Sequence, residues 1–149
     1  MIQSDVRKID FRIFRDVNSH EARYSAGTEI LKAGDISNMM YIVTNGVVAV
    51  HVDGTLVEQV TAGNIFGEMG IVDPQPHTAR VTALTDVTLY GITEQQFLQL
   101  IRSTPTFALR VMRVQARRTR AMNARLRELT KKVSGTTEGA AVSAAPASA

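Results

Sequence analysis

The stretch MMYIVTNGVVAVHVDGTLVEQV, residues 39–60, contains three short apolar segments separated by Asn45 with Gly46 and by Asp53 with Gly54. Asn-Gly and Asp-Gly pairs are typical of two-residue β-hairpin turns, because both turn positions must accept a positive φ. Residues 47–52 are rich in β-branched side chains, which pack well on a pleated surface. The stretch therefore predicts three consecutive strands joined by tight turns.

Further strands are expected on both sides of this stretch. Upstream, ARYSAG and EILKAGD each contain a glycine that closes the segment, and downstream HTARVTALT and DVTLYGI follow each other directly. Many short strands at this spacing predict a small antiparallel β-roll or jelly-roll barrel, over about residues 10–92. A short helix is expected before it, at about residues 2–9.

The periodicity changes at Thr93. Thr93 and Gln96 have the spacing of a capping box, which predicts a short helix with Phe97, Leu98 and Ile101 on its inner side. Strands followed by helices indicate the α+β class.

A second, longer helix is expected to restart at Pro105, which suits the first turn of a helix. Beyond it, apolar residues recur at steps of three or four, interrupted by Arg118, in a nearly heptad stripe. The stripe comprises Phe107, Val111, Val114, Met122, Leu126, Leu129 and Val133. It predicts one long helix over residues 105–133, and the small polar residues 134–149 predict a disordered tail.

Charge is distributed unevenly along the chain. Residues 1–104 carry 8 Lys and Arg against 12 Asp and Glu, whereas residues 105–133 carry 9 against the single Glu128. There is no cysteine, and three scattered histidines show no metal-ligand spacing, so we expect no metal and no cofactor. The sequence has neither an apolar targeting region nor a membrane-length apolar run, and a cytoplasmic protein is expected.

Residues 63–72 have the composition of an anion-binding turn. Gly63 and Gly67 frame a short loop, and one helical turn is expected from Glu68. A glycine at a helix start lets the backbone approach a ligand, and the free N–H groups there attract an anion. Glu68 beside a phosphate would suit a sugar, whose hydroxyls donate to carboxylates. The alternative is an ordinary glycine turn capped by a glutamate.

The segments IFGEM (residues 65–69) and PHTARV (residues 76–81) together resemble the phosphate-binding cassette of cyclic nucleotide-binding domains. This family, a β-roll followed by helices, occurs in catabolite activator protein, protein kinase A regulatory subunits and cyclic nucleotide-gated channels. The resemblance covers residues 8–133. It implies that such a protein binds cAMP or cGMP.

The resemblance also implies roles for individual residues. The amides of Gly67, Glu68 and Met69 would face the cyclic phosphate, Glu68 would bind the ribose 2′-hydroxyl, and Thr78 would contact the phosphate and, as in cGMP-preferring members, the guanine amino group. Phe66 and Ala79 complete the two segments, and Met122 and Asn123 match positions on the long helix that reach the base.

His77 departs from the family pattern, which has arginine at this position. Arginine is a permanent planar cation that grips two phosphate oxygens, whereas histidine is mostly neutral at pH 7. Three interpretations stay open: a degenerate pocket, a weaker site that uses His77 and the amides, and a site adapted to another anion. Arg80 is either a replacement charge or a solvated strand residue. The retained Glu68 favours a surviving site, because an unpaired buried carboxylate is costly.

The sequence thus predicts a cAMP or cGMP sensor that is not an enzyme and that relays its ligand state to an unknown protein partner through the C-terminal helix. We expect a stand-alone domain that forms a homodimer through residues 105–133, without a helix-turn-helix and without sequence-specific DNA binding. The first alternative is a ligand-independent dimerisation module on a degenerate cyclic nucleotide-binding fold. The second is a binder of nucleic acid or a membrane surface through the basic helix.

Overall fold

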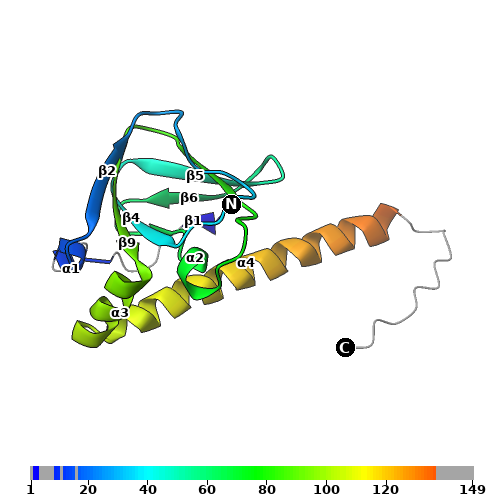
Figure 1. The fold of residues 1–149 in the computed structure, drawn as a ribbon. Helices are drawn as coiled ribbons and strands as arrows, with labels where there is room; N and C mark the ends of the chain where they lie inside the picture. The colour runs from blue at the N-terminus through cyan, green and yellow to red at the C-terminus, as the bar shows by residue number, and fades with distance from the viewer. Residues whose placement is uncertain (1, 4–8, 11, 16, 137–149) are drawn as a thin grey trace. The chain divides into compact units, whose positions relative to one another are not determined.

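The computed structural model describes residues 2–3, 9–10, 12–15 and 17–136 (Figure 1). The chain divides into two compact units, Met1–Val114 and Gln115–Ala149. The first unit holds every described strand and all of the described helices except the larger part of the last one.

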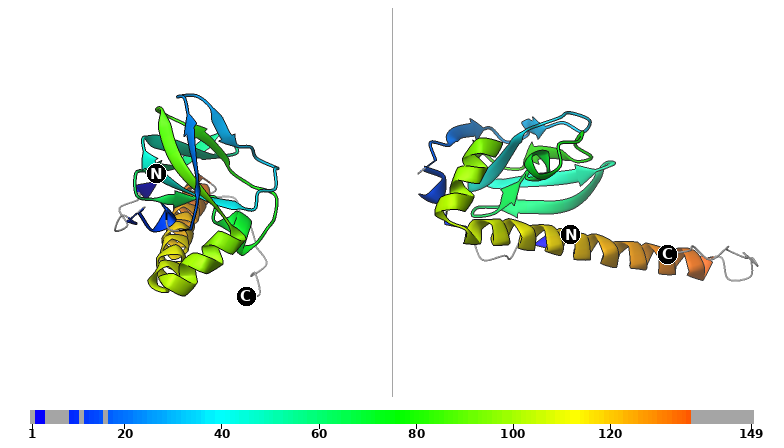
Figure 2. Two further views of the ribbon diagram at one scale, coloured as in Figure 1. Left: turned by 60° about the vertical axis from the view of Figure 1, so that its left-hand side comes forward. Right: turned by 60° about the horizontal axis from the view of Figure 1, so that its bottom comes forward.

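The strands of the first unit form two sheets that face each other in a roll (Figures 1 and 2). One sheet has the order β1-β6-β5-β8-β3 and the other the order β2-β9-β4-β7. Every pairing is antiparallel except that of β1 with β6, which is parallel. The predicted α+β class and antiparallel β-roll are therefore confirmed. The strands are β1 (Ile2–Gln3), β2 (His20–Tyr24), β3 (Glu29–Leu31), β4 (Met39–Asn45), β5 (Val47–Val52), β6 (Thr55–Thr61), β7 (Ile65–Phe66), β8 (Arg80–Ala83) and β9 (Val87–Thr93).

The two predicted hairpin turns have different outcomes. Asp53 and Gly54 both have a positive φ and join the paired strands β5 and β6, as predicted. The hairpin predicted at Asn45 and Gly46 is wrong, because β4 and β5 belong to different sheets. At Gly46, whose φ is 89°, the chain crosses from one sheet to the other. A Cβ at Gly46 would collide with the Asp86 carbonyl oxygen, so this glycine serves a close backbone approach at a corner of the roll.

Strand β4 separates two apolar clusters, because successive side chains of a strand point to opposite faces. Met40 and Ile42 belong to a cluster that also contains helix residues, including Leu100 and Phe107. Val43 belongs to the cluster between the two sheets, which we call the inner cluster. The inner cluster comprises Leu31, Val43, Val48, Val60, Phe66, Val81, Ala83, Val87 and Leu89.

The helices are α1 (Arg12–Arg15), α2 (Met69–Val72), α3 (Glu94–Ser103) and α4 (Thr106–Thr136). The capping box at the start of α3 is confirmed, since the Thr93 side chain accepts from the Gln96 N–H and the Gln96 side chain accepts from the Thr93 N–H. Leu98 was wrongly assigned to the inner side of this helix. It is 47% exposed, and Leu100, which is 1% exposed, lies in the core instead.

The short N-terminal helix is α1 rather than residues 2–9. Residues 2–3 form β1, where they pair with Glu58 and Gln59, and residues 4–8 lie outside the described part of the chain. Of the tail predicted at 134–149, residues 134–136 end α4 and the remainder lies outside the described part as well.

Helix α4 begins in the first unit and continues through the second. Its first apolar residues, Phe107, Val111 and Val114, are buried in the core of the first unit. In the second unit the stripe continues with Met122, Leu126, Leu129 and Val133, which are all exposed. Among the described residues, no helix is both long and apolar enough to span a membrane.

Candidate functional site

The first part of the candidate site is the segment of residues 65–72, which we call the α2 segment. Strand β7 ends at Phe66, and Gly67 turns the chain with a φ of 77°. The helical turn is closed by hydrogen bonds from the Gly70 N–H to the Gly67 carbonyl (3.1 Å) and from the Val72 N–H to the Glu68 carbonyl (3.1 Å). Within the described residues, the N–H groups of Gly67 and Met69 donate to no carbonyl. These two amides are available to an anion.

The α2 segment is held close to the strands beside it. A Cβ on Gly67 would lie 3.2 Å from the Tyr41 ring, and one on Gly70 would collide with the Ser37 carbonyl oxygen. Phe66 is buried and stacks on Tyr41, with ring centroids 5.1 Å apart and an interplanar angle of 18°. Burial raises the pKa of the Tyr41 phenol, the neighbouring Tyr24 raises it too, and its hydrogen bond with Ser37 acts in the opposite direction. The backbone path of this segment therefore depends on glycine at both positions.

The second part of the site is the segment of residues 76–81, which we call the His77 segment. The His77 backbone is fixed by two hydrogen bonds, from its N–H to the Asp35 carbonyl (2.8 Å) and from the Gly34 N–H to its carbonyl (2.7 Å). Its ring reaches the α2 segment, since Cε1 lies 3.7 Å from the position that a Cβ of Gly70 would take. The ring Nε2 is buried and has no hydrogen-bond partner among the described residues. It is therefore able to donate to, or accept from, a ligand.

The neighbours of His77 differ in exposure. Thr78 is exposed, and Ala79 is half-buried. Arg80 is exposed, and its guanidinium lies 3.9 Å from a Glu29 carboxylate oxygen. Arg80 thus faces an acidic side chain at the surface, which favours the interpretation of a solvated strand residue.

Glu68 is the most buried charged side chain of the site, with 2% of its surface exposed. The structure brings the α2 and His77 segments together, and with them seven of the predicted site residues: Phe66, Gly67, Glu68, Met69, His77, Thr78 and Ala79. Met122 and Asn123 lie in the middle of α4 in the second unit, and both are exposed. The sequence reasoning missed Ser37, Tyr41 and Gly70, which shape the α2 segment through contacts distant in sequence.

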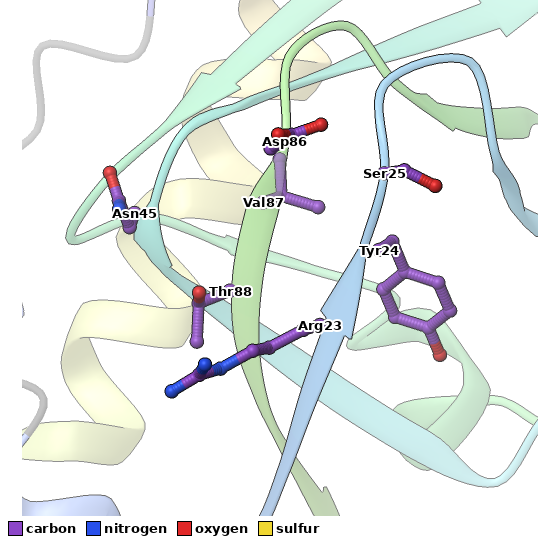
Figure 3. A pocket seen from close by; sticks show the side chains of 7 residues that line it. All are labelled: Arg23, Tyr24, Ser25, Asn45, Asp86, Val87 and Thr88. Carbon is purple, nitrogen blue, oxygen red and sulfur yellow. The ribbon is translucent and has the colours of Figure 1, made fainter.

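A cavity of about 300 Å³ lies elsewhere on the roll, at the end of β2, β4 and β9 (Figure 3). Arg23 extends past Thr88, its register partner, while the Tyr24 ring points away (Figure 3). Two polar side chains that line the cavity already have partners within the protein. Arg23 pairs with Glu21 at 3.3 Å, and Asp86 accepts from the Ala26 N–H at 2.8 Å. None of the predicted site residues lines this cavity. Its lining residues are Arg23, Tyr24, Ser25, Asn45, Asp86, Val87 and Thr88. The described residues also contain no group of three His, Cys, Asp or Glu placed to hold a metal.

A family model described as "Cyclic nucleotide-binding domain" matches residues 21–104. The chain belongs to the cyclic nucleotide-binding domain family. This match includes both segments of the site and most of the β-roll. The resemblance noted in the sequence is thereby confirmed, and the family is one defined by ligand binding.

Individual relatives agree with this assignment. The cAMP-dependent protein kinase regulatory subunit of Dictyostelium discoideum is 31% identical over 86 residues, which is 54% of this chain and 26% of that protein. A cGMP-dependent protein kinase of Caenorhabditis elegans is 32% identical over 105 residues, 65% of this chain and 14% of that protein. This chain thus covers about a quarter or less of the length of these relatives.

A solved structure has the same fold. The catabolite activator protein of Thermus thermophilus superposes with a TM-score of 0.70 at 27% sequence identity, covering 80% of this chain and 58% of the other. The β-roll with its following helices is therefore the fold of a cyclic nucleotide-binding domain.

Proposed function

We propose that the chain binds a 3′,5′-cyclic purine nucleotide between the α2 and His77 segments. The observation that carries the proposal is the position of His77: its ring lies against Gly70, in the turn that carries the amides of Gly67 and Met69. A phosphate between them would meet N–H donors from one segment and the imidazole from the other. Of the three interpretations of His77, this proposal adopts the weaker site that uses His77 and the amides, in place of the degenerate pocket.

Glu68 would bind the ribose in this arrangement. It directly follows Gly67, so a sugar attached to a phosphate at the amides lies within reach of its carboxylate. A buried carboxylate gains most from a ligand whose hydroxyls donate to it. Thr78 would add a hydroxyl from the exposed side.

Thermal unfolding in the presence of nucleotides tests the proposal. A ligand at 100 times its dissociation constant stabilises the folded state by about 2.7 kcal/mol, which raises the melting temperature by about 5–10 °C for a chain of this size. We expect this shift with cAMP, cGMP or both. We expect none with a cyclic dinucleotide, because it carries two phosphates in one large ring and the proposed site takes a single phosphate. If neither cAMP nor cGMP at millimolar concentration changes the melting temperature or releases heat in calorimetry, the proposal is wrong and the degenerate-pocket alternative replaces it.

The relay to a partner would run through α4. The exposed stripe of Met122, Leu126, Leu129 and Val133 suits a second copy of this chain, because a helical stripe at steps of three and four buries itself against an equivalent stripe. The nine basic residues over 105–133 oppose this pairing, and salt screens their repulsion. A homodimer strengthened by added salt is therefore expected.

Light scattering of the Leu126→Glu, Leu129→Glu double variant tests the dimer. We expect a dimer at micromolar concentration for the wild type and a folded monomer for the variant. A matched control is Glu128→Gln, which lies between the two substituted residues but outside the apolar stripe. If the wild type is a monomer at this concentration, the proposed homodimer is excluded. Retention of the wild type on DNA or on anionic vesicles, lost at high salt, would support the basic-helix alternative in its place.

A further inference from the structure

The connection between β3 and β4, residues 32–38, contacts the His77 segment with its first half. We call this connection the β3–β4 loop. The Gly34 N–H donates to the His77 carbonyl at 2.7 Å, and the His77 N–H donates to the Asp35 carbonyl at 2.8 Å. Both backbone groups of His77 are therefore held by this loop, and the position of the imidazole depends on the path that the loop takes.

The second half of the β3–β4 loop meets the α2 segment. The Ser37 carbonyl oxygen occupies the space that a Cβ of Gly70 would need, and the carbonyl carbon lies 3.1 Å from that Cβ position. The His77 ring borders the same position, with its Cε1 at 3.7 Å. Just beyond the loop, the Met39 carbonyl oxygen lies 3.3 Å from where a Cβ of Gly67 would be. One short stretch of backbone thus lies against both parts of the proposed site.

The side chain of Ser37 fixes the second half of this loop. Its hydroxyl oxygen is partly buried and accepts from the Met39 N–H at 3.2 Å. Burial raises the pKa of the Tyr41 phenol, and a hydrogen bond with Ser37 lowers it, so the hydroxyl also reaches β4. A serine that bonds to the backbone two residues further on restricts the conformation of a loop. Without this hydroxyl, the loop loses the bond that keeps the Ser37 carbonyl against Gly70.

We propose that Ser37 is a positioning residue of the cyclic nucleotide site, which sets the separation between the His77 ring and the amides of the α2 segment. A phosphate accepts from both segments only when this separation matches the spacing of its oxygens, because hydrogen bonds weaken steeply outside a narrow range of distance and angle. Ser37 acts through the donors and needs no contact with the ligand. This inference rests on the proposed function, because it requires a phosphate that both segments bind.

A double-mutant cycle with His77, measured by calorimetric titration with cAMP and cGMP, tests this role. Ser37→Ala is expected to lower affinity about 3- to 10-fold, as for the loss of one hydrogen bond. In the His77→Ala background the same change should cost less than about 2-fold, because one of the two groups that Ser37 positions is absent. Ser37→Thr keeps the hydroxyl and should restore wild-type affinity. The matched control Ser25→Ala removes an exposed hydroxyl from another loop and should have no effect.

The outcomes separate this inference from the proposed function. If the wild type binds neither nucleotide, the proposed function fails. If the wild type binds but Ser37→Ala keeps its affinity, or costs the same factor with and without His77, the positioning role is excluded and the proposed function stands. Should Ser37→Ala fail to fold by circular dichroism, Ser37→Cys replaces it in the cycle, because a thiol is only a weak hydrogen-bond acceptor, and the same comparison decides.

Discussion

The α2 segment and the His77 segment would bind the same phosphate by different means. Residues 65, 66, 68 and 70 of the α2 segment are buried, and its donors are backbone amides shaped by two glycines. In the His77 segment, Thr78 and Arg80 are exposed and the donor is a side chain. One segment depends on a backbone path, and the other depends on the identity of one residue.

This difference explains where the chain departs from the family pattern. A change in the α2 segment would displace buried backbone, because a side chain at Gly70 meets the Ser37 carbonyl oxygen. A change at residue 77 would alter the donor and keep the hydrogen bonds to Gly34 and Asp35, because both use the backbone of this residue. The chain thus differs from the arginine that the resemblance implies at a position whose donor would be a side chain.

The largest effect is expected from Gly70→Ala. The added Cβ has no space beside the Ser37 carbonyl oxygen, so the α2 turn must shift and its amides lose their alignment. We expect cyclic nucleotide binding to become undetectable by calorimetry, and the free energy of unfolding to fall by about 1–3 kcal/mol. The matched control is Gly135→Ala in α4, where a Cβ has no atom within 4 Å; it should not reduce stability or binding. If Gly70→Ala binds cyclic nucleotides with wild-type affinity, binding does not depend on the backbone conformation of the α2 segment.

An intermediate effect is expected from Glu68→Ala. Loss of a charge-assisted hydrogen bond to the ribose costs about 1.5–3 kcal/mol, or about 10- to 150-fold in affinity. The specific check is 2′-deoxy-cAMP, which lacks the hydroxyl. The wild type should prefer cAMP over this analogue, and Glu68→Ala should bind the two equally. If Glu68→Ala still prefers cAMP over 2′-deoxy-cAMP, another residue binds the ribose 2′-hydroxyl.

The smallest effect is expected at His77. A protonated imidazole carries a charge and a second donor, and an anion favours this form. Affinity should therefore rise about 3- to 10-fold as the pH is lowered from 8.5 to 5.5. His77→Arg should bind more tightly at pH 8.5 and lose this dependence, while His77→Ala should keep the weak high-pH affinity throughout. If wild-type affinity is independent of pH and His77→Arg gains nothing, His77 does not contact the phosphate.

The sequence predicted those features that depend on local chemistry. The capping box at Thr93, the turn at Asp53 and Gly54 and the helical turn after Gly67 all form, because the residues that specify them are neighbours in the chain. Asn45 and Gly46 have the same local pattern as a hairpin turn, yet β4 and β5 separate there because each strand pairs with partners distant in sequence.

Long-range packing explains the other differences. The α4 stripe looks uniform in the sequence, but only Phe107, Val111 and Val114 are buried by the first unit. Ser37 and Tyr41 were overlooked in the same way, because only the folded chain brings them against Gly70 and Gly67.

The tight turn at Asp53 and Gly54 has a practical consequence. A Cβ on Gly54 would have no atom within 4 Å, so the tip of this hairpin lies in open space, unlike the packed corner at Gly46. Exposed loop tips are the places where inserted domains are tolerated. A fluorescent protein inserted between Asp53 and Gly54 would be attached to the paired strands β5 and β6. With a nucleotide bound as proposed, an insertion at this hairpin would report the ligand without opening the core of the roll.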